Sequence, residues 1–261
     1  MTSINDALRA GHAAPPVRHA APRRVLVIGG GGALGSAVLE QLLASTAFVQ
    51  TAVLVTQRLG TALRGLVTVP EAALALPAGD DTAVLVFDRL RHANGREQAF
   101  AWPQPQDLPA LAAALRRRGV RSLLVVMPHA SASLPDALRH GLANLDEHAV
   151  AALGFEHLVF VRSAQAPSVL RSRHPLQAIA DGVLSQLQLM IPQRDQPVRA
   201  QKVAQFVTQL AAHLAEMPGG TRVVPPELVW QAAQVGDVDS LARDWLHGKT
   251  VAEMPAGAMR L

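Results

Sequence analysis

The chain has 261 residues, 49% of them apolar, with a net charge of +4 and no cysteine. This length and composition predict a folded domain with a buried core, and they exclude a disulfide framework, thiolate metal sites and cysteine nucleophiles. The isoelectric point of about 10.8 overstates the basic character, because neither tyrosine nor cysteine is present to titrate at alkaline pH. The one dense basic run, Arg116–Arg118 with Arg121, is typical of a solvated helix end. We expect a cytoplasmic protein that binds no nucleic acid.

The first 22 residues are rich in Ala, Pro, His and Arg and have no apolar signal-peptide core, so we expect a flexible tail. The apolar stretch between residues 25 and 55 is interrupted by glycines and by Glu40 and Gln41, which argues against a membrane span. The predicted organisation is a tail over 1–22, a dinucleotide-binding domain over 23–165, and a mainly helical segment over 166–261 that completes the fold.

Apolar runs without polar alternation predict strands at Val25–Ile28, Ala52–Val55, Thr82–Phe87, Ser122–Met127 and His157–Val161, with an edge strand at Thr221–Val224. Apolar residues at helical spacing predict helices at about 34–43, 107–118, 138–153 and 198–216. Two more helices are predicted, one opened by Pro225 and Pro226 and a last one capped by Asp239 and Ser240. Prolines between 167 and 197 space out short helical segments. This alternation predicts a doubly wound α/β fold with a mostly parallel, Rossmann-type sheet and a small helical C-terminal segment.

The most informative motif is the glycine run between the first strand and the first helix. It matches G-x-G-x-x-G from Gly30 and G-x-x-G-x-x-G from Gly29. In such turns the first glycine allows a tight reversal, the second a close approach of phosphate, and the third close helix packing. The expected cofactor-binding residues here are Gly29, Gly30, Gly32, Ala33, Leu34 and Gly35, whose amides at the helix start suit a diphosphate. The alternative is a strand–helix turn that binds no ligand.

Charge at the end of the second strand indicates which dinucleotide is favoured. An NAD site commonly has a carboxylate there, whereas a 2′-phosphate requires its absence and a nearby cation. No acidic residue occurs between Gln41 and Pro70, and the strand is followed by Gln57 and Arg58. This favours NADP over NAD. The alternative is that Arg58 is an ordinary exposed arginine in a loop and binds no phosphate.

With these motifs the chain resembles the atypical short-chain dehydrogenase/reductase family, in particular its NmrA-like branch of NAD(P)-binding proteins. The resemblance runs from about 23 to 163 and more loosely to 224. It implies that Asp88, after what the sequence predicts to be the third strand, contacts adenine. It also implies that Met127, Pro128 and His129 pass beneath the ribose and nicotinamide. Ser163 matches one serine of the family's strand-end pair, and Arg162 replaces the other.

One departure from that family concerns catalysis. Active members use a tyrosine and a lysine to exchange a proton with the substrate. This chain has no tyrosine, and its only lysines are Lys202 and Lys249, outside the expected region from 167 to 189. The remaining catalytic candidates are His129, which could exchange a proton, and Ser163, which could orient a substrate. Each also fits a structural role, His129 as a loop histidine and Ser163 as a turn residue.

The polar stretch 88–97 either folds over the adenine or the 2′-phosphate, with Arg89 or Arg91 as a cation, or forms a solvent-facing loop that turns at Asn94 and Gly95. No close histidine spacing predicts a metal site. Two functions stay open: an NADP-binding oxidoreductase acting on an unidentified small molecule, and a non-catalytic NADP(H) sensor or assembly factor with a protein partner. Direct DNA binding lacks a clustered basic face.

Overall fold

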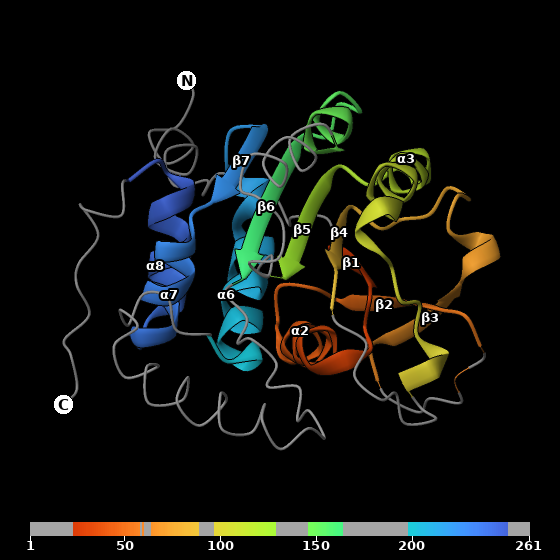
Figure 1. Cartoon of the computed structure of the whole chain (residues 1–261), viewed down its shortest axis with the longest axis horizontal. Helices are drawn as coiled ribbons and strands as arrows, with labels where there is room; N and C mark the ends of the chain where they lie inside the picture. Colours follow the sequence, from red (N-terminus) through yellow and green to blue (C-terminus); the bar gives the residue numbers. More distant parts are fainter. Residues whose placement is uncertain are drawn as a thin grey trace, which may run out of the picture.

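The computed structural model describes residues 23–57, 59, 64–88, 97–128, 146–163 and 198–249. In this part of the chain a seven-stranded sheet has the order β3-β2-β1-β4-β5-β6-β7 (Figure 1). All neighbouring strands are parallel. The strands are β1 (Arg24–Ile28), β2 (Gln50–Val55), β3 (Leu66–Pro70), β4 (Thr82–Val86), β5 (Ser122–Pro128), β6 (His157–Ser163) and β7 (Gly220–Val224).

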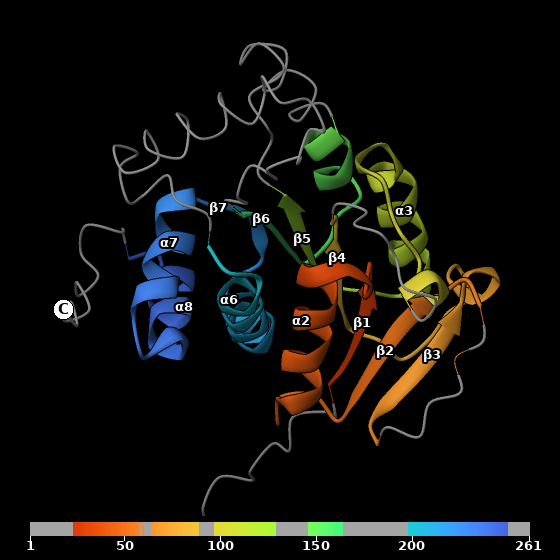
Figure 2. The ribbon, with the colours of Figure 1, turned by 60° about the horizontal axis from the view of Figure 1, so that its bottom comes forward.

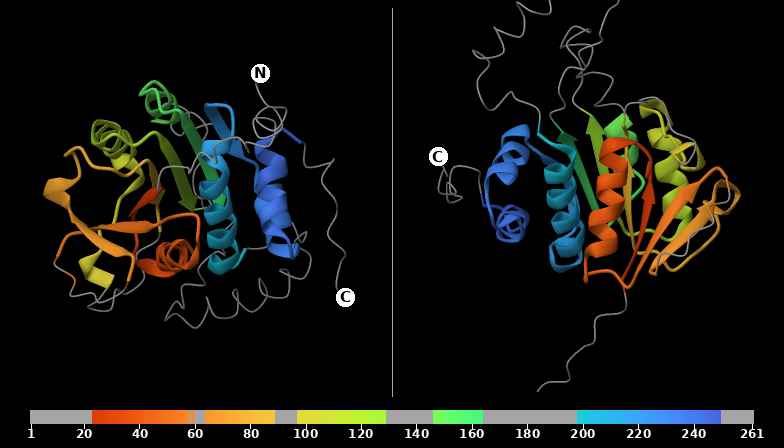
Figure 3. Two further views of the ribbon diagram at one scale, coloured as in Figure 1. Left: turned by 180° about the vertical axis from the view of Figure 1, so that it is seen from behind. Right: turned by 90° about the horizontal axis from the view of Figure 1, so that it is seen from below.

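Helices cover both faces of this sheet. The named helices are α2 (Gly32–Ala44), α3 (Leu108–Arg118), α6 (Ala200–His213), α7 (Pro226–Gln234) and α8 (Val238–Leu246). In Figures 2 and 3, α2 and α6 lie side by side on one face with α7 and α8 next to α6, and α3 lies on the other face. Short 3₁₀ turns occur at η1 (Glu71–Ala73), η2 (Glu97–Ala99), η3 (Pro105–Asp107) and η6 (Leu214–Glu216).

Both faces of the central strands are therefore buried, and the core has two layers. Along β1, Val25 and Val27 pack toward the layer of α2 and α6, while Leu26 and Ile28 pack toward the layer of α3. Double burial explains why the strands read as continuous apolar runs. The predicted doubly wound α/β fold of Rossmann type is confirmed.

The order in which successive strands are added to the sheet reverses at β1. From β1 it builds outward through β2 to β3, and it then returns to place β4 on the other side of β1. The carboxyl ends of β1 and β4 thus flank the switch point, where open α/β sheets bind their ligands. The glycine turn joins β1 to α2 at this point.

Three expectations are corrected. The sequence analysis missed β3, so the strand before Asp88 is the fourth along the chain and lies beside β1. The cap of α8 is Asp237, whose side chain accepts a hydrogen bond from the Ser240 amide at 3.0 Å, and not the Asp239–Ser240 pair. Arg118 is only 6% exposed and pairs with Asp80, whereas the arginine run was expected to be solvated.

Several expectations lie outside the described residues: the tail over 1–22, the helical segments between 167 and 197, and the candidate residues Arg58, Arg89 and His129. The helix expected over 138–153 is described only from 146, and residues 146–151 are helical. Within the described ranges, no helix combines the length and apolarity needed to cross a membrane.

Candidate functional site

The backbone of the turn between β1 and α2 depends on its glycines. Gly29 has φ +89° and Gly32 has φ +75°, a region that residues with a side chain rarely adopt. A Cβ atom added to Gly35 would lie 1.8 Å from the carbonyl oxygen of Gly29. The first turn of α2 therefore packs directly on the chain leaving β1, as the third-glycine role requires.

The same glycines are covered by the protein itself. Gly29 to Gly32 are buried, while Ala33 is exposed. A Cβ atom on Gly31 would lie 2.8 Å from Cζ2 of Trp102, and one on Gly30 would lie 3.3 Å from Cδ1 of Phe100. Absence of side chains on the turn lets these two aromatic rings approach its backbone.

A carboxylate occupies the amino end of α2. Asp88 Oδ2 accepts a hydrogen bond from the Leu34 amide at 2.7 Å, and a Cβ atom on Gly32 would lie 2.6 Å from the same oxygen. The positive end of a helix dipole and its unpaired amides favour such an anion. Asp88 reaches this position because β4 runs beside β1.

Residues 97–102 cross the carboxyl end of β2. The Ala101 amide donates to the Leu54 carbonyl at 3.2 Å, and the Thr56 amide donates to the Ala99 carbonyl at 2.9 Å. The Gln57 amide also points to Ala99, at 3.4 Å. Gln57 is exposed, at the position where the sequence predicts contact with the 2′-substituent.

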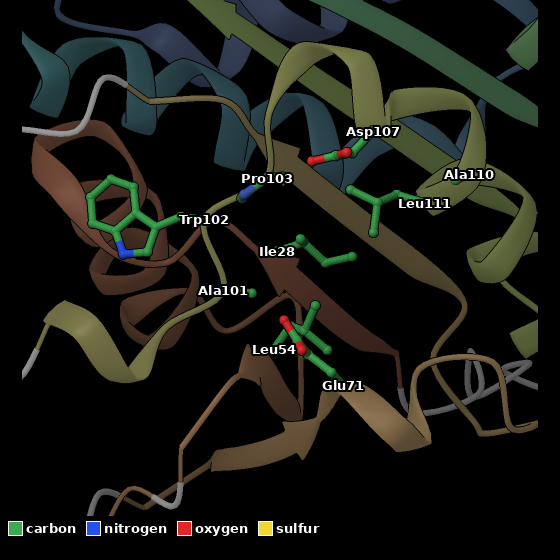
Figure 4. A pocket seen from close by; sticks show the side chains of 9 residues that line it. All are labelled: Ile28, Leu54, Glu71, Ala101, Trp102, Pro103, Asp107, Ala110 and Leu111. Carbon is green, nitrogen blue, oxygen red and sulfur yellow. The ribbon is translucent and has the colours of Figure 1, made fainter.

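A cavity of about 300 Å³ lies at the same edge, on the α3 side of the sheet (Figure 4). Ile28, Leu54 and Leu111 direct their side chains into its centre, and the carboxylates of Glu71 and Asp107 stand at opposite edges. The Trp102 ring points away from these residues, toward the glycine turn. The segment that carries Trp102 therefore separates the cavity from the turn.

The other candidate residues lie further along the sheet edge. Met127 is half-buried at the end of β5, and Pro128 pairs in register with Ser163 of β6. Since β4 and β5 separate β1 from β6, Ser163 is about 14 Å across the sheet from the end of β1 at normal strand spacing. No cluster of three or more metal-ligating side chains occurs among the described residues.

The structure brings together the glycines, Leu34 and Asp88, and it places Gln57 one strand away. Sequence reasoning missed Phe100, Trp102 and Glu71. The sequence does mark the two aromatic residues. Phe100-Ala101-Trp102 is an apolar triplet within a polar stretch, and only 3% of the chain is aromatic. Glu71 was missed together with β3, which it follows.

No protein-family model and no curated protein matches the chain. Among solved structures, a short-chain dehydrogenase family protein from Francisella tularensis is 15% identical over 78% of this chain and 97% of that chain, with a TM-score of 0.48. The triphenylmethane reductase of Citrobacter sp., complexed with NADP(H), is 14% identical over 88% and 93%, with a TM-score of 0.47.

A short-chain dehydrogenase/reductase superfamily protein from Agrobacterium tumefaciens with bound NAD is 16% identical over 77% of this chain and 76% of that chain, with a TM-score of 0.45. Two of these three proteins, those from Francisella and Agrobacterium, bear the name of the short-chain dehydrogenase group. Similarities this weak assign no cofactor or reaction to this chain, and the NmrA-like branch stays a prediction.

Proposed function

We propose that this protein binds a dinucleotide, NADP in preference to NAD, at the carboxyl edge of β1, β2 and β4. The observation that carries the proposal is the glycine turn at the switch point, in which Gly35 lies against Gly29 and α2 begins at the carboxyl edge of the sheet. Gly29, Gly32 and the Leu34 amide would hold the diphosphate. This geometry fits the group, provided that Asp88 and Trp102 give up the space they occupy.

The cavity beside the turn supports a place for the adenine base. Its apolar walls, Ile28, Leu54 and Leu111, suit the flat faces of a purine, and Glu71 could accept a hydrogen bond from an exocyclic amine. The resemblance assigned adenine to Asp88 because it follows the third predicted strand. With β3 counted, the acidic residue after the third strand is Glu71, and we propose it for that role.

Preference for NADP rests on the residues after β2. The absence of any carboxylate from 41 to 70 removes the usual partner of a free 2′-hydroxyl, and Arg58 would pair with a 2′-phosphate. Calorimetric titration with NADPH, NADH and their oxidised forms tests this. We expect the Arg58→Gln variant to lose about tenfold in affinity for NADPH and none for NADH, which corresponds to about 1.4 kcal/mol. Arg64→Gln, an exposed arginine before β3, is the matched control. Tighter binding of NADH by the wild type would refute the preference.

A redox role would use hydride transfer supplied by the bound dinucleotide, and the chain would contribute a proton. With no tyrosine present, His129 is the predicted site residue that exchanges a proton near neutral pH. In the sequence it directly follows Pro128, the last residue of β5, which pairs in register with Ser163 of β6. NADPH oxidation should be measured with carbonyls, quinones and activated alkenes. A reaction that His129→Gln leaves unchanged would remove this residue from the mechanism.

The covered glycine turn favours a second candidate, a non-catalytic NADP(H) sensor. If binding must move residues 97–102, the ligand alters the surface of the protein, and such a change can be read by a partner. We expect NADPH to change limited proteolysis within 89–102 in the absence of any substrate. Sustained NADPH turnover on a small molecule would contradict the sensor and support the oxidoreductase.

A further inference from the structure

We propose that Asp88 and the segment Glu97–Trp102 form an internal plug on the amino end of α2, which a dinucleotide must displace to bind. The inference rests on the proposed function, and it concerns how that same site is regulated. The plug is defined by three contacts with the turn: the Asp88 carboxylate, the Trp102 indole and the Phe100 ring.

Asp88 holds the position that suits a phosphate oxygen. Its Oδ2 atom receives the Leu34 amide at 2.7 Å, and this amide belongs to the first turn of α2, where the helix dipole favours an anion. A diphosphate would compete for the same amide. It would also meet a like charge at close range, which disfavours simultaneous occupancy.

Trp102 and Phe100 hold the space above the turn. A Cβ atom added to Gly31 would lie 2.8 Å from Cζ2 of Trp102, and one added to Gly32 would lie 3.1 Å from Cη2 of the same ring. A methyl group would already clash at Gly31, so a phosphate group cannot enter while the ring is there. Trp102, Phe100 and Asp88 thus contribute to the burial of Gly30 to Gly32, whereas Gly29 packs against Val86 of β4.

The attachment of the plug is local and can be released without unfolding the sheet. One isolated antiparallel bridge, Val55 to Phe100, joins it to β2. The Ala101–Leu54 and Thr56–Ala99 hydrogen bonds flank that bridge, and the Trp102 Nε1 donates to the Glu97 carbonyl at 3.1 Å within the segment itself. Although Ala99 and Ala101 are buried, a short segment that a few hydrogen bonds hold at the end of a strand opens more easily than a core strand.

A plug of this kind lowers apparent affinity by the fraction of molecules that are open. Loosening it should therefore tighten dinucleotide binding without any new contact to the ligand. Asp88→Asn removes the charge while preserving shape, and Trp102→Ala removes the ring. Asp244→Asn, on α8, is a matched control because its carboxylate pairs with Lys249, at 2.8 Å, at the end of that helix.

The experiment measures NADPH dissociation constants by calorimetry for the wild type and these variants, with thermal unfolding as a check of folding. We expect Asp88→Asn and Trp102→Ala each to bind at least about tenfold more tightly than the wild type, and Asp244→Asn to bind equally. In a Trp230→Phe, Trp245→Phe background, Trp102 is the only tryptophan. Saturating NADPH should then increase acrylamide quenching of Trp102 and speed hydrogen exchange of the Ala101 amide.

The possible failures are distinguishable. If the wild type binds NADPH, the two plug variants bind it no more tightly, and Trp102 quenching does not change, the plug is refuted while the proposed function stands. If neither the wild type nor either plug variant binds any of the four dinucleotide forms, the proposed function is refuted and the inference falls with it.

Discussion

Gly35 lies inside α2, yet its side-chain position is filled by the preceding turn. A Cβ atom there would lie 1.8 Å from the Gly29 oxygen and 2.9 Å from the Gly29 carbonyl carbon. Alanine is favoured over glycine in a helix interior by about 1 kcal/mol. The clash involves backbone atoms that cannot rotate away, so it outweighs this gain.

We therefore predict that Gly35→Ala lowers the free energy of unfolding by at least about 2 kcal/mol, because α2 must move away from β1. Urea denaturation followed by circular dichroism measures the change. Gly236→Ala is the control, since no atom lies within 4 Å of its Cβ position and its φ is not positive. Its stability should stay within about 0.5 kcal/mol of the wild type. Equal stability of the two variants would contradict the proposed packing.

The conformation of these glycines could be predicted because it depends on neighbours within a few positions along the chain. The contact between Asp88 and Leu34 could not, since 54 positions separate the two residues. It follows from the placement of β4 beside β1, which requires the strand order. The burial of the turn under Trp102 likewise depends on where residues 97–102 cross the sheet, and no local pattern specifies this.

At the scale of elements, the end of α3 is joined to the connection between β3 and β4 by one buried ion pair. Arg118 Nε contacts Asp80 Oδ2 at 2.7 Å, and both side chains are only 7% exposed. Arg118 Nη1 also donates to the Ala73 carbonyl at 2.8 Å. A charge run that sequence analysis assigns to solvent thus includes one residue with a structural role.

Replacing Arg118 with alanine should lower the free energy of unfolding by about 3–5 kcal/mol, because the Asp80 carboxylate would stay buried without its partner. Arg121→Ala serves as the control, as its pair with Glu156 is exposed and worth at most about 1 kcal/mol. Chemical denaturation measures both. The double variant Arg118→Met, Asp80→Leu should recover most of the loss. A loss for Arg118→Ala no larger than that for Arg121→Ala would contradict this role.

The missed strand β3 has a physical explanation. It is an edge strand of five residues, only Val69 is buried, and Pro70 ends it without an amide proton. Such a strand has neither the apolar run of a doubly covered strand nor a clean alternation. The central strands were predictable because burial on both faces requires a continuous run of apolar residues.

At the scale of the whole molecule, the two core layers cover the central strands. Several polar side chains at the amino end of the sheet are therefore buried as well. His157 begins β6 and is 4% exposed. Desolvation lowers its pKa, and the charges of Arg121, Arg222 and Arg23 act in the same direction, whereas Glu156 at 3.7 Å opposes them. The folded protein therefore holds this histidine neutral across a range where the unfolded chain binds a proton.

The lowered pKa of His157 in the folded protein determines how the free energy of unfolding depends on pH. Above the unfolded pKa, near 6.5, neither state is protonated and His157 adds no dependence. As the pH falls below that value, the unfolded state gains a proton first, so stability declines by at most about 1.4 kcal/mol per pH unit until the folded pKa is reached. Urea denaturation between pH 5 and 8 should show this loss in the wild type and a smaller one in His157→Gln. A difference between the two proteins that is constant over this range would contradict a buried neutral His157.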